Sequence, residues 1–126
     1  MIGLQNLFKY YKNPNQDFLR ALYNSAAIFL SPSLMEGFPL PPAEAMMSGA
    51  ALVASDIGGH LEYAINGQNA LLFPPKDISK SLDCLLNLVT NKELRIKLAY
   101  AGHSSIKSFT WEKSVDMFEK FILGNI

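Results

Sequence analysis

Short runs of apolar residues alternate along the chain with segments whose apolar residues recur at helical spacing. Three of the runs are nearly continuous in apolar residues and have the length of strands: residues 26–31, residues 50–55 and Ala70–Phe73. Strands have this pattern when a parallel sheet is covered on both faces. A fourth, shorter strand is predicted at residues 6–10. The pattern therefore indicates a largely buried parallel sheet.

The segments between and after these runs carry helix signals. Gln16–Ser25 has Phe18, Leu19 and Leu22 at helical spacing, behind the candidate cap Asn15. Two shorter helices are predicted at residues 41–48, which Gly49 ends, and at residues 60–65, which follow a turn at Gly58-Gly59. Two longer helices are predicted at residues 92–107 and at residues 111–123, the second behind the cap Thr110. A further helix follows the cap Asp77, and its apolar face consists of Ile78, Leu82, Leu85, Leu86 and Val89.

Strands and helices alternate at a spacing that requires right-handed crossovers and a parallel sheet. The predicted fold class is α/β: a three-layer, Rossmann-like, mostly parallel sheet with a helical C-terminus, formed by residues 1–126 as a single domain. His60 follows the glycine turn and could face a ligand, but it is expected merely to start a short helix. In the last helix Trp111, Val115, Phe118 and Ile122 recur at helical spacing, which predicts either core or a docking surface.

Composition excludes several classes of protein. With 49% apolar and 17% charged residues, the chain is not a disordered tail. Eleven basic and eleven acidic side chains cancel, so the basic excess expected of a protein that binds nucleic acid is missing. The single cysteine, Cys84, favours a reducing compartment. No apolar run approaches the ~20 residues that cross a bilayer, and a cytoplasmic protein without a transmembrane segment is predicted.

The stretch from Ser31 to Met46 carries the candidate chemistry. Its loop leaves the carboxyl end of a buried strand, where open parallel sheets bind ligands, and enters a helix whose N-terminus favours an anion. Glu36 lies in this loop and Glu44 in the first turn of the helix. An ionised carboxylate only accepts hydrogen bonds, which suits the hydroxyls of a sugar. The spacing of eight residues alone is more typical of two solvated carboxylates near a helix start.

The surrounding residues resemble the E-x7-E region of group 1 (family 4) glycosyltransferases, in the C-terminal domain of the GT-B fold. The resemblance covers nearly the whole chain and is densest from Ser31 to Asp77. The matching residues are Glu36-Gly37-Phe38, Leu40-Pro41, Glu44-Ala45-Met46 and Ser48-Gly49, then Leu52 to Asp56, Gly58-Gly59, Glu62, Asn66-Gly67, Leu71 to Pro75 and Phe109 to Glu112.

The resemblance implies a donor that is a nucleotide-diphosphate sugar, and transfer with retention of configuration. Glu36 would be the catalytic carboxylate, touching the transferred sugar near the reacting carbon, and Glu44 would bind the ribose hydroxyls. The family is described as needing no metal, and no Asp-x-Asp pair occurs here; no cofactor is expected. The backbone that would line the sugar and diphosphate pocket belongs to Gly37, Phe38, Pro39 and Leu40.

Two departures from the family pattern stand out. Pro39 occupies a position that is commonly glycine, which removes one N–H. The upstream arginine and lysine that hold the diphosphate have no counterpart here. The chain is therefore expected to be an incomplete donor-binding half, lacking the N-terminal acceptor domain and the first strands and inactive alone. Its open sheet edge would permit a homodimer. A non-catalytic nucleotide-sugar-binding module and an unrelated α/β regulatory domain are the alternatives.

Overall fold

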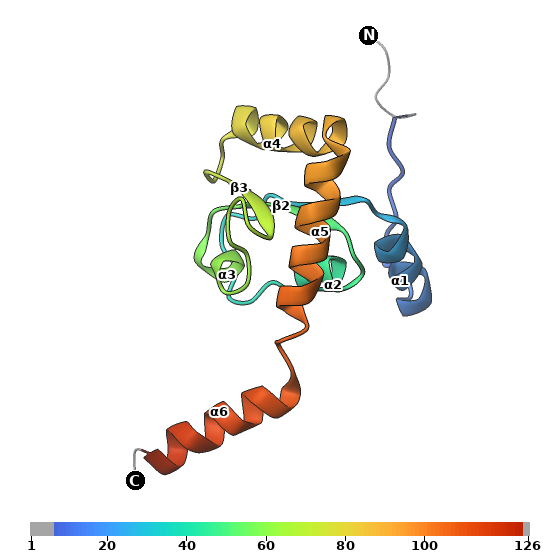
Figure 1. Ribbon diagram of the computed structural model, residues 1–126. Coiled ribbons are helices and arrows are strands. Elements are labelled where there is room, and N and C mark those ends of the chain that lie inside the picture. Colours follow the sequence, from blue (N-terminus) through green and yellow to red (C-terminus); the bar gives the residue numbers. More distant parts are fainter. Residues whose placement is uncertain (1–6, 125–126) are drawn as a thin grey trace.

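A parallel sheet with helices on both faces forms the centre of the molecule, and one helix extends away from it (Figure 1). The computed structural model describes residues 7–124. The elements are α1 (Gln16–Ser25), β1 (Ile28–Ser31), α2 (Leu40–Met47), β2 (Ala51–Ser55), α3 (Gly58–Leu61), β3 (Ala70–Phe73), α4 (Ile78–Thr90), α5 (Lys92–Ile106) and α6 (Trp111–Gly124).

The three strands lie in the order β1-β2-β3, and both pairs are parallel. Ile28 is opposite Ala51, and Leu52 is opposite Ala70. The predicted α/β class and parallel sheet are confirmed. The strand predicted at residues 6–10 is wrong for residues 7–10, which form a turn and irregular chain, and Asn6 lies outside the described residues. A short apolar run becomes a strand only when another strand pairs with it.

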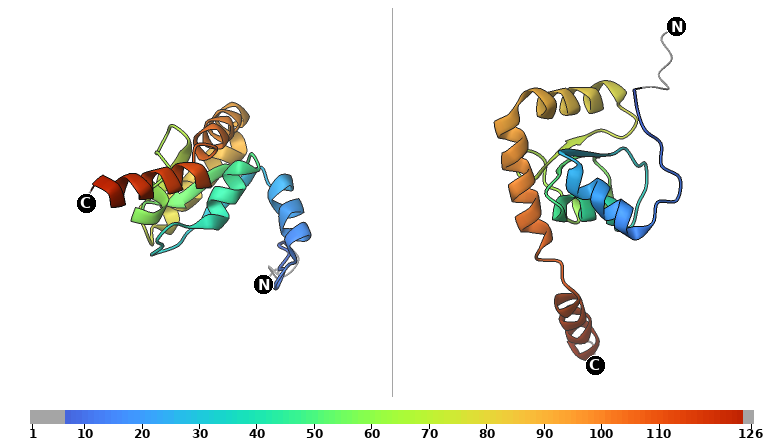
Figure 2. Two further views of the ribbon diagram at one scale, coloured as in Figure 1. Left: turned by 90° about the horizontal axis from the view of Figure 1, so that it is seen from below. Right: turned by 90° about the vertical axis from the view of Figure 1, so that its right-hand side faces the viewer.

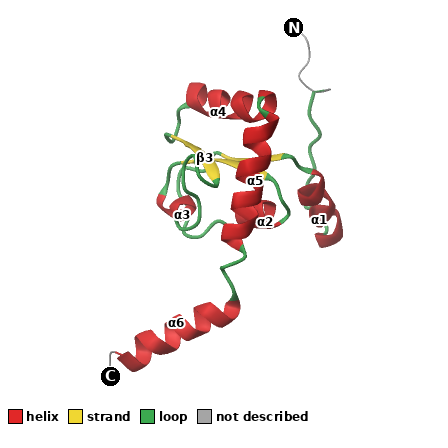
Figure 3. Ribbon diagram, in the orientation of Figure 1, coloured by secondary structure: helices red, strands yellow, loops and turns green. Residues whose placement is uncertain are grey.

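Alternate residues of β2 face different layers, which confirms the three-layer arrangement. Ala51 and Val53 pack with Leu88 of α4 and with α5, whereas Leu52 and Ala54 pack with α2 and the segment after α3. Figure 3 shows α4 on one side of the strands and α2 and α3 on the other. In Figures 1 and 2, α5 runs from α4 past the sheet to α2. Every residue of β2 is buried, so both faces of the sheet centre are covered.

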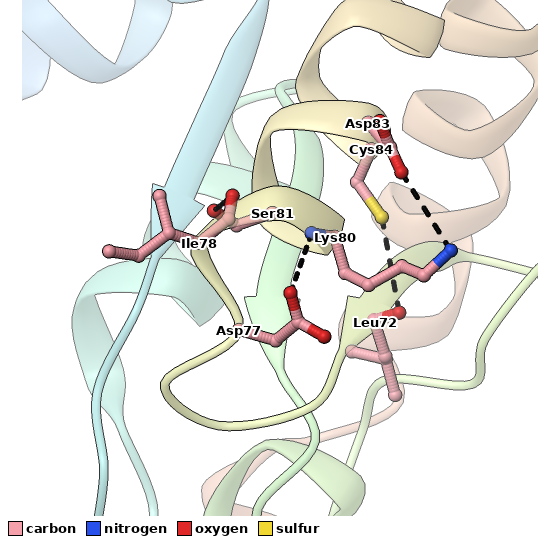
Figure 4. A network of polar contacts seen from close by, with 7 residues as sticks. All are labelled: Leu72, Asp77, Ile78, Lys80, Ser81, Asp83 and Cys84. Carbon is pink, nitrogen blue, oxygen red and sulfur yellow. Dashed lines mark hydrogen bonds and ion pairs between the residues drawn. The ribbon is translucent and has the colours of Figure 1, made fainter.

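Most predicted helix ends are confirmed by their capping contacts. The Asn15 side chain accepts from the Phe18 N–H at 2.9 Å, and Asp77 accepts from the Lys80 N–H at 2.9 Å (Figure 4). Thr110 Oγ1 accepts from the Lys113 N–H at 3.3 Å. Gly49 ends α2 with a φ of +89°, a left-handed conformation that glycine adopts without a steric penalty.

Two helices differ from the prediction. Glycines 58 and 59 lie inside α3, because the Ile57 carbonyl already accepts hydrogen bonds from the N–H groups of His60 and Leu61. In α4, Leu85 and Leu88 pack on the sheet. Four of the five residues of the predicted apolar face are exposed, because the pattern does not show which part of a wide stripe meets the core. They are Ile78, Leu82, Leu86 and Val89.

Helix α6 lies apart from the sheet and its covering helices (Figures 1 and 2). Its apolar stripe is exposed, from 84% at Trp111 to 42% at Ile122. The prediction that this stripe belongs to the core is therefore wrong, and the alternative of a docking surface stays a prediction. Across residues 7–124, none of the helices is both long and apolar enough to span a bilayer.

Candidate functional site

A buried histidine joins the carboxyl ends of β1 and β2, where the candidate site begins. His60 Nδ1 lies 2.8 Å from the Ser55 carbonyl oxygen, and its Nε2 lies 2.9 Å from Ser31 Oγ. A carbonyl only accepts, so Nδ1 carries a proton and donates to Ser55, while Nε2 pairs with the Ser31 hydroxyl, which can both donate and accept. His60 is fully buried. It therefore connects the strand ends and does not face a ligand, a role that no local sequence signal reveals.

The loop between β1 and α2 is held against the start of α3. The Ser55 hydroxyl donates to the Ser33 carbonyl at the beginning of the loop. A Cβ placed on Gly59 would lie 2.5 Å from the Glu36 carbonyl oxygen and 2.8 Å from that of Gly37. Only glycine leaves room for this backbone. Of the two glycines that match the family pattern, Gly58 and Gly59, the second is therefore required for steric reasons.

Glu36 is exposed on this loop, with its carboxylate oriented by a neighbouring hydroxyl. Ser33 Oγ donates to Glu36 Oε1 at 3.0 Å. No ion pair involves Glu36 among the described residues, in which only Lys80 and Asp83 are paired. Space next to Gly37 is open, since a Cβ there would meet no atom within 4 Å. The Glu36 carboxylate therefore keeps acceptor capacity toward solvent at the sheet's carboxyl edge.

Aromatic side chains fix the second half of the loop. The Phe38 ring packs edge-on against Tyr63, with 5.3 Å between the ring centroids, and at a tilt against Phe109, with 5.8 Å between the centroids. The Tyr63 hydroxyl donates to the Pro39 carbonyl at 2.8 Å. Burial raises the pKa of Tyr63, and the negative charge of Glu36 raises it further, so the phenol stays protonated and able to donate. Phe38 and Pro39 thus have structural roles for their side chains and carbonyl.

The start of α2 has few free donors. The four N–H groups without a partner inside a helix are those of the N-cap and the first three residues. Here Pro39 is the N-cap, and Pro41 and Pro42 follow Leu40 in the first turn. Leu40 alone carries an N–H, so the expected set of free N–H groups is reduced to one. The helix also begins at Leu40, one residue before the predicted start.

Glu44 is exposed on α2 and points toward α1. It lines a cavity of about 260 Å³ together with residues of both helices, and Glu36 is not among them. The lining residues are Gln16, Leu19, Arg20, Tyr23, Glu44, Met47 and Ser48. The two glutamates therefore belong to one loop-and-helix unit but face different surroundings.

No metal centre is visible in the described part of the chain. Residues 7–124 contain no group of three or more His, Cys, Asp or Glu side chains that could hold a metal ion. The site consists of two exposed carboxylates, one free helix N–H and a loop fixed by His60, Gly59 and Tyr63. The fold and the site together define an α/β domain whose loop lies at the carboxyl ends of its parallel strands, the position at which sheets of this kind bind ligands.

Comparison with known proteins identifies the family. Residues 2–105 match the family described as glycosyl transferases group 1. An uncharacterized glycosyltransferase of Methanocaldococcus jannaschii is 31% identical over 99 residues, which make up 79% of this chain and 28% of that protein. The chain belongs to the group 1 glycosyltransferase family. It spans only about a quarter of the length of this relative.

Solved structures show the same fold. Sucrose-phosphate synthase from Thermosynechococcus elongatus superposes with a TM-score of 0.80 at 22% identity, covering 92% of this chain and 30% of that one. The C-terminal domain of a group 1 glycosyltransferase, LpcC from Francisella tularensis, superposes with a TM-score of 0.68 at 29% identity, covering 80% of this chain and 51% of that one. The described fold is that of a GT-B C-terminal domain.

Proposed function

We propose that this chain is the donor-binding part of a retaining glycosyltransferase that uses a nucleotide-diphosphate sugar. The observation that carries the proposal is the loop from Ser31 to Glu44. It carries both family glutamates and follows the carboxyl end of a parallel strand, where such sheets bind ligands. Family membership supports the same assignment.

The proposed roles follow from what each group can accept or donate. Glu44 accepts hydrogen bonds from the ribose hydroxyls, and Glu36 accepts from the transferred sugar close to the reacting carbon. The backbone of Gly37, Phe38, Pro39 and Leu40 lines the sugar and diphosphate pocket. Open space at Gly37 and the fixed carbonyl of Pro39 support a backbone that is shaped before the donor arrives.

The site offers few groups that could bind the negative charge of the diphosphate. The positive end of α2 favours an anion, but only Leu40 offers a free N–H there. The family's basic phosphate-binding residues have no counterpart in the chain. Binding of a nucleoside diphosphate is therefore expected to be weak. The same shortage of donors favours the second candidate, a nucleotide-sugar-binding module without catalysis.

Glu44→Gln is expected to weaken nucleotide binding about tenfold or more. The substitution keeps the size of the side chain but replaces two anionic acceptors with one neutral acceptor and a donor, and hydrogen bonds to a charged group are worth about 1.5–3 kcal/mol. Calorimetry with UDP, GDP, ADP and dTDP measures the loss. Glu93→Gln, on the exposed first turn of α5, is the matched control and should bind like the wild type. Equal affinity of Glu44→Gln and wild type would rule out the ribose role.

We also propose weak self-association through the edge of β1. Within residues 7–124, β1 pairs only with β2, and Leu30 beside the open edge is 38% exposed. An unpaired edge is a template for another chain, and a lysine there opposes pairing. Sedimentation should show a concentration-dependent dimer that Leu30→Lys abolishes and Phe118→Lys on α6 preserves. A strictly monomeric wild type, or loss of the dimer only in Phe118→Lys, would contradict the edge contact.

A further inference from the structure

The structure assigns a positioning role to Tyr23: its hydroxyl holds the Glu44 carboxylate in the orientation that a ribose needs, at the cavity between α1 and α2. This inference rests on the proposed function and goes beyond it, because the family motif contains only the glutamate. Tyr23 lies on a different helix and twenty-one residues earlier in the chain.

The packing of Tyr23 fixes where its hydroxyl points. The residue is on the last turns of α1, its ring centroid is 5.9 Å from that of Phe29 on β1, and it lines the same 260 Å³ cavity as Glu44. A ring held against the sheet leaves the phenol oxygen as its polar end. Tyr23 therefore offers Glu44 a donor whose position is set by the fold.

The pKa of Tyr23 and the absence of an ion pair at Glu44 in the part of the chain that the structure describes indicate which group donates a hydrogen bond to this carboxylate. Burial raises the pKa of Tyr23 to about 12, and a hydrogen bond to Glu44 and the charge of Glu44 contribute to the rise. The phenol is thus protonated at neutral pH and donates to the carboxylate. Arg20 lines the same cavity, but no ion pair between it and Glu44 occurs in the described chain. Glu44 is therefore oriented by a neutral donor, the Tyr23 hydroxyl.

Orientation matters because Glu44 is exposed at its helix surface. A free glutamate side chain occupies several rotamers, and fixing it when a ligand binds weakens the affinity. A donor that holds one carboxylate oxygen reduces this loss and leaves the remaining lone pairs for the ribose. Tyr23 acts through Glu44 and does not itself need to touch the nucleotide.

Tyr23→Phe tests the role because it removes only the hydroxyl and keeps the ring on Phe29. Affinity for the nucleoside diphosphates UDP, GDP, ADP and dTDP is expected to fall about threefold to tenfold, the effect of one hydrogen bond. Tyr11→Phe is the matched control: it removes a hydroxyl from an exposed ring that packs on Phe18 at 4.9 Å. Its affinity should equal that of wild type. Inorganic pyrophosphate, which has no ribose, should bind both variants like wild type.

The decisive readout is the coupling between the two residues. In a Glu44→Gln background, Tyr23→Phe should cause no further loss of affinity, because its effect runs through the carboxylate. An equal loss in both backgrounds, an equal loss for pyrophosphate, or no loss in Tyr23→Phe would overturn the positioning role while the proposed function stands. Absence of nucleotide binding by the wild type would instead defeat the proposed function and this inference with it.

Discussion

The 126-residue chain, assayed alone with nucleotide sugars, is expected to transfer no sugar above the uncatalysed rate. Orientation of two reactants can supply ~7–11 kcal/mol of a barrier, and under the proposed function these residues provide the donor site only, so they supply little of it. Each missing donor to the leaving-group charge costs about 3 kcal/mol more. The structure adds a reason of its own, since the start of α2 has a single free N–H.

The assay for this prediction measures release of nucleoside diphosphate from UDP-, GDP-, ADP- and dTDP-sugars. The chain alone is compared with the chain mixed with a separately expressed acceptor domain, and with the product of a longer reading frame. Clear transfer by the 126 residues would overturn the prediction. If the longer protein releases no nucleoside diphosphate from any common donor, the result would favour the non-catalytic nucleotide-sugar-binding module.

Gly59→Ala is expected to displace the candidate loop and abolish measurable nucleotide binding. The new methyl group would lie 2.5 Å from the Glu36 carbonyl oxygen, and the obstacle is backbone that cannot rotate away. Overpacking of this kind costs about 1–3 kcal/mol of stability. Gly58→Ala is the matched control, because a Cβ there meets no atom within 4 Å. Urea unfolding and calorimetry with the four nucleoside diphosphates measure the two effects.

The comparison of the two alanine variants separates steric displacement from a change in helix propensity. Both substitutions replace glycine with alanine in the first turn of α3, so any gain in helix propensity is shared. If Gly59→Ala binds and unfolds like Gly58→Ala, the loop does not depend on this contact. If both variants lose binding equally, the helix start matters and the contact with Glu36 does not.

Local features of this protein were predictable from its sequence because they depend on nearby residues. The caps at Asn15, Asp77 and Thr110 are confirmed, since a cap needs only a side-chain oxygen three residues from an N–H. The three buried strands are confirmed because their apolar runs are suited to a covered parallel sheet. The motif from Glu36 to Glu44 was also visible, because its residues are close in the chain.

The predictions that failed concern partners that are distant in the chain. Residues 7–10 are apolar enough for a strand but have no strand partner in the structure. Of the two alternatives for the stripe at Trp111 and Phe118, core or docking surface, the core is excluded because the stripe is exposed. The spacing of apolar residues shows which face of a helix or strand is apolar, but it does not show whether another element covers that face.

The sequence by itself determined the fold class, the order of the elements and the position of the two glutamates. Only the tertiary structure decided what positions the loop and the helix that carry them: His60 between the strand ends, Gly59 against the loop backbone, and Tyr23 beside Glu44. The contacts of His60 with Ser31, of Gly59 with Glu36 and of Tyr23 with Glu44 each join residues that are more than twenty positions apart in the chain. Hydrogen bonds and close packing depend on distances of 3–4 Å, and such distances exist only after the strands have paired and the helices have packed on them.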